Sequence, residues 1–285
     1  MKNQRYQVVI EDAYVNLQAL KLFELLGFSI VKKDTEFGEY GQFILKNGAL
    51  IFRHDDLQIT STEIDHVIDN YKKTFRSIRK QPLAKSVGIK NIQENKLILD
   101  LTSGVGNDLL LLKAFGANVL GVERSEICTA LLMFGAISSS GDDLPIIVKE
   151  DSLNFLSFLK GVDSGNSSGI IFNQGCKDKV IRLSSYKESL NSLLSEGEPQ
   201  VIYLDPMYDE INKKTLPRKE MQVLRNVLPK GTPEDTERLF YHSFEIVKDR
   251  VVMKRSMKAK VKFSDHFSHS IIGKSTRYDV YLKRT

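Results

Sequence analysis

An apolar stretch that ends in an acid and enters a glycine turn constrains the fold of this chain more than any other feature. Residues 97–100 read Leu-Ile-Leu-Asp, Gly104 and Gly106 follow, and an apolar run from Leu109 to Phe115 comes next. This order predicts a buried parallel strand that leads through a tight turn into a helix. Glycine lets the turn approach a ligand closely, and the helix start presents free N–H groups. We therefore expect a doubly wound α/β sheet with a nucleotide-like ligand at its carboxyl edge.

Two further strands that end in polar side chains follow at the spacing of strand-helix units. Residues 118–122 form an apolar run that ends at Glu123, and residues 146–148 lead to Asp151 and Ser152. An acid at the end of the second strand suits the two hydroxyls of a ribose. The polar residues after the third strand would lie at the same edge of the sheet.

The glycine turn is not a complete dinucleotide fingerprint. Leu109 stands where that fingerprint requires a third small residue, which disfavours a dehydrogenase. Acids at the first and second strands and a polar pair at the third are instead the layout of an S-adenosylmethionine site in class I methyltransferases. For Asp100 and Asp151 taken singly, N-capping of a helix is an equally good interpretation.

Composition limits the remaining possibilities. With 285 residues, 41% of them hydrophobic, the chain can bury one large core and a small second one. The net charge is only +5, so any nucleic-acid interface depends on where the charges lie. The spacing of Cys128 and Cys176 fits neither a disulfide framework nor a metal site, and His266 and His269 lack partner ligands, so we expect no metal. Without a run of about 20 apolar residues or a signal segment, we expect no membrane contact and a cytoplasmic protein.

The pattern divides the chain into three parts. We expect a small α/β lobe over residues 1–60, a basic helix and linker over 61–95, and the main domain over 96–285. A Gly/Ser/Asn cluster marks an insertion at about 160–198, with a short helix over 186–194. Inside the lobe we expect one helix that ends at Gly27, a turn at Asn47-Gly48, and strands over residues 7–10, 28–31, 42–45 and 49–52.

Helix boundaries are predicted at several places in the rest of the chain. Apolar residues at three- and four-residue spacing predict a long helix over 64–78, and Pro82 should close it. Thr232 should be the N-cap of a helix that runs to about Val247. Residues 268–272 and 278–282 should pair as a terminal antiparallel hairpin.

A reactive sequence follows the apolar strand 201–204. It reads Asp205-Pro206-Met207-Tyr208 and is similar to the Asp/Asn-Pro-Pro-Tyr signature of methyltransferases that act on exocyclic amines of bases. Such an amine is a poor nucleophile because its lone pair is delocalised into the ring. The Asp205 carboxylate and the Pro206 carbonyl could hold both amine protons and aim the lone pair, while Tyr208 could stack on the base. A plain turn at a strand end is the alternative for this tetrapeptide alone.

Basic residues gather near these motifs. On a single helix they usually form a solvent-exposed face, but close to the cofactor strand and the reactive strand we expect phosphate contacts. The candidates for binding RNA are Arg79, Lys80, Lys213, Lys214, Arg218, Lys219, Lys254, Arg255 and Arg277.

From about residue 80 onward the chain resembles the ribosomal small-subunit RNA methyltransferase J family. The resemblance rests on eight stretches: 84–90, 100–108, 122–124, 151–153, 201–208, 219–221, 250–255 and 277–281. It implies a Rossmann-like class I fold and transfer of methyl from S-adenosylmethionine to the exocyclic N2 of a guanine in 16S ribosomal RNA. No metal and no membrane are implied.

The resemblance also carries site residues onto this chain. It implies cofactor contacts at Asn107, Asp108, Glu123, Arg124, Asp151, Ser152 and Asp205, to which the glycine turn adds Asp100, Gly104 and Gly106. The catalytic candidates are Asp205, Pro206 and Tyr208. The chain departs from the family at Asn107, commonly arginine, and at Asp151, commonly serine. It also lacks the glycine-rich run before residue 84, and residues 1–60 match poorly.

Two rival functions stay open at this point. An adenine-N6 methyltransferase acting on RNA or DNA would use the same reactive sequence. A non-catalytic RNA-binding protein of ribosome assembly would keep the fold without the reaction, although the intact Gly104, Gly106, Asp205 and Tyr208 argue against it.

Overall fold

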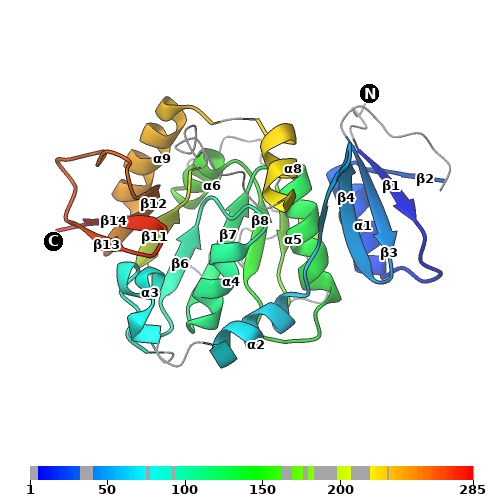
Figure 1. Cartoon of the computed structure of the whole chain (residues 1–285), viewed down its shortest axis with the longest axis horizontal. Coiled ribbons are helices and arrows are strands. Elements are labelled where there is room, and N and C mark those ends of the chain that lie inside the picture. The colour runs from blue at the N-terminus through cyan, green and yellow to red at the C-terminus, as the bar shows by residue number, and fades with distance from the viewer. Residues whose placement is uncertain are drawn as a thin grey trace.

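The chain forms two β-sheets, a five-stranded one near the N-terminus and a nine-stranded one in the main body (Figure 1). Their arrangement comes from a computed structural model, which describes residues 6–32, 41–74, 78–91, 94–161, 169–175, 179–182, 198–206, 219–229 and 231–284.

The large sheet has parallel strands in its centre and antiparallel strands at both edges. Its spatial order is β10 (Val180–Arg182), β9 (Ile170–Phe172), β8 (Ile146–Lys149), β7 (Asn118–Glu123), β6 (Leu97–Asp100), β11 (Val201–Leu204), β12 (Arg250–Ser256), β14 (Thr276–Leu282) and β13 (His269–Ile272). Strands β8, β7, β6, β11 and β12 are parallel neighbours. The predicted terminal hairpin is confirmed, and β14 lies between its two neighbours β12 and β13.

Helices cover both faces of this sheet, because each central strand is apolar on both sides. In β6, Ile98 belongs to the apolar cluster of one face and Leu99 to that of the other. The first cluster includes residues of α2 (Ile64–Thr74), α4 (Asn107–Ala114) and α5 (Glu126–Ser138). The second includes α6 (Ser152–Leu159) and α9 (Pro233–Ile246), which pack on each other. The result is the expected α/β/α layering.

The small sheet packs beside α5 (Figure 1). It contains β2 (Ser29–Val31), β1 (Gln7–Ile10), β3 (Gln42–Lys46), β4 (Ala49–His54) and β5 (Leu57–Thr60) in that spatial order. Helix α1 (Leu17–Leu26) ends at Gly27, which has φ +74°, as predicted. The ring of Phe23 on α1 stacks on that of Phe134 on α5, with 6.4 Å between centroids. One apolar cluster therefore continues from the small sheet into the main body, and the division at residues 60 and 95 stays a prediction.

Several boundaries differ from the prediction. Helix α2 is described as far as Thr74, residues 75–77 lie outside the described residues, and a short 3-10 helix, η1 (Ile78–Lys80), precedes Pro82. Pro82 does not close a long helix; it occupies the first turn of α3 (Pro82–Ser86), where its missing N–H costs nothing. Strand β5 was not anticipated, and neither was α8 (Lys219–Val227), which packs on it.

The predicted insertion contributes an extension to the sheet. Strands β9 and β10 pair antiparallel at the edge next to β8. The short helix expected over residues 186–194 lies outside the described residues.

Candidate active site

The strand register brings the predicted acids to one edge of the large sheet. Tyr203 of β11 lies opposite Asp100 of β6, and Leu204 lies opposite Met253 of β12. Asp205 follows Leu204 directly and Lys254 follows Met253 within β12, so the two charged side chains meet where β11 ends. Asp205 and Lys254 are distant in sequence, and only the β11–β12 pairing makes them neighbours.

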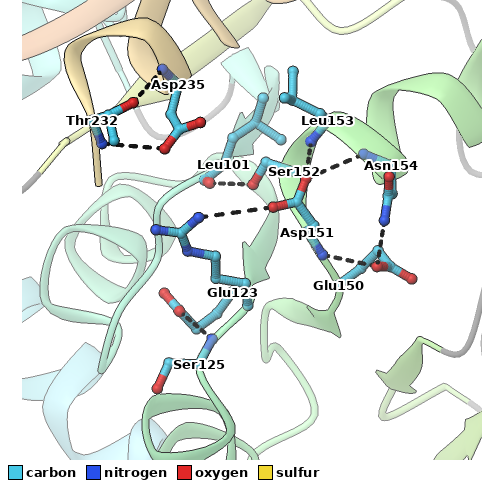
Figure 2. Close-up of polar contacts among 11 residues, drawn as sticks. Leu101, Glu123, Ser125, Glu150, Asp151, Ser152, Leu153, Asn154, Thr232 and Asp235 are labelled. Atoms are coloured by element: carbon cyan, nitrogen blue, oxygen red, sulfur yellow. Dashed lines mark hydrogen bonds and ion pairs between the residues drawn. The ribbon is translucent and has the colours of Figure 1, made fainter. Parts of the chain in front are cut away.

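Glu123 holds the glycine turn in place. Its Oε2 accepts from the backbone N–H of Gly104 at 2.7 Å. Its Oε1 accepts from the backbone N–H of Ser125 at 2.6 Å, a hydrogen bond that Figure 2 shows. Burial raises the pKa of Glu123 against the lowering effect of these hydrogen bonds. Glu123 thus ties the end of β7 to the turn after β6.

Both glycines of the turn have positive φ, +55° at Gly104 and +92° at Gly106. A Cβ at Gly106 would lie 2.5 Å from Cδ1 of Leu132, so this position needs glycine for space as well as for conformation. A Cβ at Gly104 would meet nothing within 4 Å. The open side of the turn is therefore at Gly104, as a ligand-facing backbone requires.

Asp100 is buried at the end of β6. It caps no helix; its Oδ1 accepts from the backbone N–H of Thr102 at 3.0 Å. Burial, together with the nearby carboxylates of Asp108, Asp205 and Glu123, raises its pKa well above the usual range. The Thr102 hydroxyl oxygen accepts from the backbone N–H of Asp205 at 2.6 Å, and so links the turn after β6 to the reactive strand.

Lys254 joins two of the predicted site acids. Its Nζ lies 2.6 Å from Oδ2 of Asp108 and 2.8 Å from Oδ2 of Asp205. The Tyr203 hydroxyl also donates to Oδ2 of Asp108, at 2.6 Å. Burial opposes the charge on Lys254, but Asp205 and Asp108 outweigh it, and the pKa of Lys254 lies above its ordinary value. We call Lys254, Asp108, Asp205 and Tyr203 the carboxylate–lysine cluster.

Sequence reasoning placed Lys254 among the phosphate contacts and left Tyr203 and Thr102 out of the site. The structure gives the Lys254 ammonium two carboxylate partners within the protein. The basic residues around Lys254 were the only sequence signal for it. Its partners follow from strand register, which the sequence pattern does not specify.

The end of β8 forms another side of the site (Figure 2). Asp151 is the N-cap of α6: its Oδ1 accepts from the backbone N–H groups of Leu153 at 2.9 Å and Asn154 at 3.4 Å. Its Oδ2 lies 4.0 Å from Nη1 of the exposed Arg124. The capping interpretation of Asp151 is thus confirmed, and a ligand contact there stays a prediction. The Ser152 hydroxyl donates to the backbone oxygen of Leu101, connecting β8 to β6.

Only some of the remaining predicted site residues lie within the described part of the chain. Pro206 is half-buried beside Asp205, and Asn107 is exposed at the start of α4. The backbone of Met207 and Tyr208 lies outside the described residues, as do three of the predicted RNA contacts, Lys213, Lys214 and Arg218.

Two other predicted RNA contacts form hydrogen bonds within the protein. Arg255 is buried, and its Nη2 donates to the backbone oxygen of Lys260 at 3.3 Å. Arg277 forms two hydrogen bonds with Asp279, at 2.7 and 2.9 Å. Lys80 is exposed on η1, and the side chains of Arg79 and Lys219 are not described. Of the described predicted cations, Lys80 alone has its side chain exposed to solvent.

The residues at the carboxyl ends of β6 and β7 fit S-adenosylmethionine. The open backbone at Gly104 and the carboxylate of Glu123 stand at adjacent strand ends, where an adenosine with its ribose hydroxyls would be bound. Within the described part of the chain, no group of three His, Cys, Asp or Glu side chains could hold a metal ion. The helices described there are also too short or too polar to cross a membrane.

Comparisons with known proteins identify the family. The family model for SAM-dependent methyltransferases matches residues 42–154 and 174–283. A ribosomal RNA small subunit methyltransferase J from Saccharophagus degradans is 31% identical over 251 residues, covering 82% of this chain and 83% of the relative. The chain belongs to the ribosomal RNA small subunit methyltransferase J family. A member from Thioalkalivibrio sulfidiphilus is 32% identical over 213 residues, covering 74% of this chain and 71% of the relative.

Membership of the family makes the chain a class I methyltransferase that uses S-adenosylmethionine. The fold agrees: a SAM-dependent methyltransferase from Neisseria gonorrhoeae superposes with a TM-score of 0.57 at 18% identity, covering 97% of this chain and 95% of that chain. The family match begins at residue 42, inside the small sheet, and so earlier than residue 80, where the motifs alone placed its start.

Proposed function

We propose that the chain transfers a methyl group from S-adenosylmethionine to the exocyclic N2 of a guanine in 16S ribosomal RNA. The small subunit's RNA is the substrate class in the names of its relatives, and the family resemblance supplies the base and the atom. The observation that carries the proposal is the Asp205 carboxylate at the same sheet edge as the glycine turn, linked to that turn through Thr102. A ribosomal RNA substrate implies that the enzyme works in the cytoplasm.

The chemistry needs the amine to be aligned rather than strongly activated. Bound S-adenosylmethionine supplies a methyl group on a sulfonium, which is already a good leaving group. Asp205 and the Pro206 carbonyl would accept the two N2 protons and direct the nitrogen lone pair. Tyr208 would stack on the base. Glu123 would hold the ribose, with Asp100, Gly104, Gly106, Asn107, Asp108, Arg124, Asp151 and Ser152 around the cofactor.

Lys254 would act on this reaction through Asp205. It holds Oδ2 of Asp205 at 2.8 Å, which fixes the rotamer of the carboxylate. A carboxylate paired with a cation is a weak base, so alignment of the amine is its main task and the proton can leave to water after methyl transfer. We therefore assign Lys254 as a positioning residue.

The test is methyl transfer from labelled S-adenosylmethionine to small-subunit RNA taken from cells that lack this gene, followed by nucleoside mass analysis. We expect N2-methylguanosine with the wild-type chain and at least a hundredfold lower rate with Asp205→Ala. The matched control is Asp265→Ala, which removes an exposed carboxylate outside the site and should leave the rate unchanged.

Each other outcome would select a different function. Label on adenine N6 would make the chain an adenine methyltransferase. Binding of S-adenosylmethionine and RNA without any transfer would favour a non-catalytic role in ribosome assembly. A folded Asp205→Ala variant with near-normal turnover would contradict the role of Asp205.

A further inference from the structure

A basic cavity lies at the edge of the large sheet opposite to the active site. Its volume is about 560 Å³, and the cations that line it are Lys85, Lys90, Lys96 and Arg250. Lys96 directly precedes β6 and Arg250 begins β12. Asp100 and Lys254 lie four residues further along the same strands, or roughly 13 Å away at about 3.3 Å per residue. The cavity is therefore separate from the cofactor site but close to it.

Two of these cations converge on Gly88. A Cβ at Gly88 would lie 3.1 Å from both Nζ of Lys96 and the guanidinium carbon of Arg250. Gly88 has no side chain, which leaves room for both groups, and its φ of +73° also favours glycine. Both cations thus lie beside the same point, and like charges held close together repel each other unless an anion lies between them.

Among the described residues that line the cavity, little negative charge balances these cations. Glu94 is the one carboxylate among the residues that line the cavity, and its Oε1 accepts from the backbone N–H of Lys90 and from Nδ2 of Asn91. In the described part of the chain, Lys96 forms no ion pair. Four cations against one acid leave a net positive cavity.

Arg250 also has a donor without an acceptor. Its Nη1 donates to the backbone oxygen of Ser86 at 3.4 Å, which anchors the guanidinium. Its Nε is buried and has no hydrogen-bond partner within the described residues. Buried N–H groups are normally satisfied, so this donor points to a ligand oxygen.

We infer that the cavity binds a phosphate of the RNA backbone, away from the target base. Anchored guanidinium and ammonium groups suit a phosphate, and the exposed Lys85 and Lys90 flank an opening through which an RNA strand can continue. Such a contact positions RNA without reading its sequence. The inference rests on the proposed RNA substrate, and it assigns a role to the stretch 84–90, which carried part of the family resemblance but no chemistry.

The test measures RNA binding rather than catalysis. Fluorescently labelled small-subunit RNA is titrated with the full-length protein at several salt concentrations. Lys96→Gln should weaken binding roughly threefold to fivefold. It should also lower the slope of log K against log salt by about 1, as expected for one lost phosphate contact. The double variant Lys85→Gln/Lys96→Gln should lose more.

Three controls make the result specific. Lys248→Gln removes the same charge from an exposed lysine outside the cavity and should match the wild type. Binding of S-adenosylmethionine to Lys96→Gln should be unchanged. At saturating RNA its kcat should equal that of the wild type, with the loss confined to KM for RNA.

Two results would overturn the inference. One is a Lys96→Gln variant with wild-type RNA affinity and salt slope. The other is tight binding of inorganic phosphate, measured by calorimetry, that disappears in Lys96→Gln while RNA binding does not change; the cavity would then be a site for a free anion. Failure of the proposed function is distinguishable, because the wild type would bind RNA without methylating guanine N2.

Discussion

Replacing Lys254 with methionine removes the charge of the carboxylate–lysine cluster while keeping much of the side-chain volume. The variant leaves the carboxylates of Asp108 and Asp205 without the ammonium that lies 2.6 and 2.8 Å from them. A hydrogen bond to a charged group contributes about 1.5–3 kcal/mol. The side chain of Asp205 is 37% exposed, so water replaces part of the second bond. We expect a total loss of about 3 kcal/mol, in line with the cost of breaking a buried pair.

Thermal unfolding followed by circular dichroism measures this loss. At roughly 2–4 °C per kcal/mol for a large domain, the melting temperature should fall by about 6–12 °C. Since the pKa of Lys254 is raised in the fold, its stabilisation is complete below the ordinary lysine pKa of about 10.4 and is lost only above it. The decrease should therefore be equal at about pH 6 and pH 8. Lys258→Met, at an exposed lysine, is the control.

Activity gives a second, independent measurement. Because Lys254 fixes the Asp205 carboxylate, kcat should fall tenfold to a hundredfold, as for a misplaced positioning group. A double-mutant cycle with Asp108→Asn should be strongly non-additive. A Lys254→Met protein that melts within about 1 °C of the wild type and turns over normally would refute the cluster's role.

Three further predictions concern single residues. Gly106→Ala should destabilise the fold by about 2 kcal/mol and weaken cofactor binding in calorimetry, because its Cβ meets Leu132 at positive φ. Thr232→Ala should cost about 1 kcal/mol in denaturant unfolding, because it removes the capping box of α9. In a Cys176→Ser background, Cys128 should resist iodoacetamide at about pH 8 until the protein unfolds, since burial raises the pKa of its thiol well above the usual range.

Local rules explain why much of the fold was predictable. Strand β6 is a short apolar run bounded by a glycine turn, and each such run in the parallel core predicted a strand correctly. The capping box at Thr232 and Asp235 marked the start of α9 because it is formed by residues close in sequence. Gly27 marked the end of α1 for the same reason.

The errors come from interactions between distant parts of the chain. Pro82 fits both the end of one helix and the first turn of another, and α3 forms because it packs on β13 and β14. The pairing of Lys254 with Asp108 and Asp205 was missed because nothing near Lys254 in sequence shows that β12 lies beside β11. The acids of the site could be predicted from strand ends, whereas the lysine that neutralises them could not.

The two hydrogen bonds that Glu123 accepts have a thermodynamic consequence for the cofactor. They fix the turn at Gly104 through groups of the protein itself, since both donors belong to the backbone and the acceptor is Glu123. Ordering one residue costs about 1–2 kcal/mol of conformational entropy, and here folding has already met that cost. With S-adenosylmethionine bound at this turn, as we propose, the turn would be preorganised, so association would not have to wait for it to order and the affinity would not be reduced by that entropy.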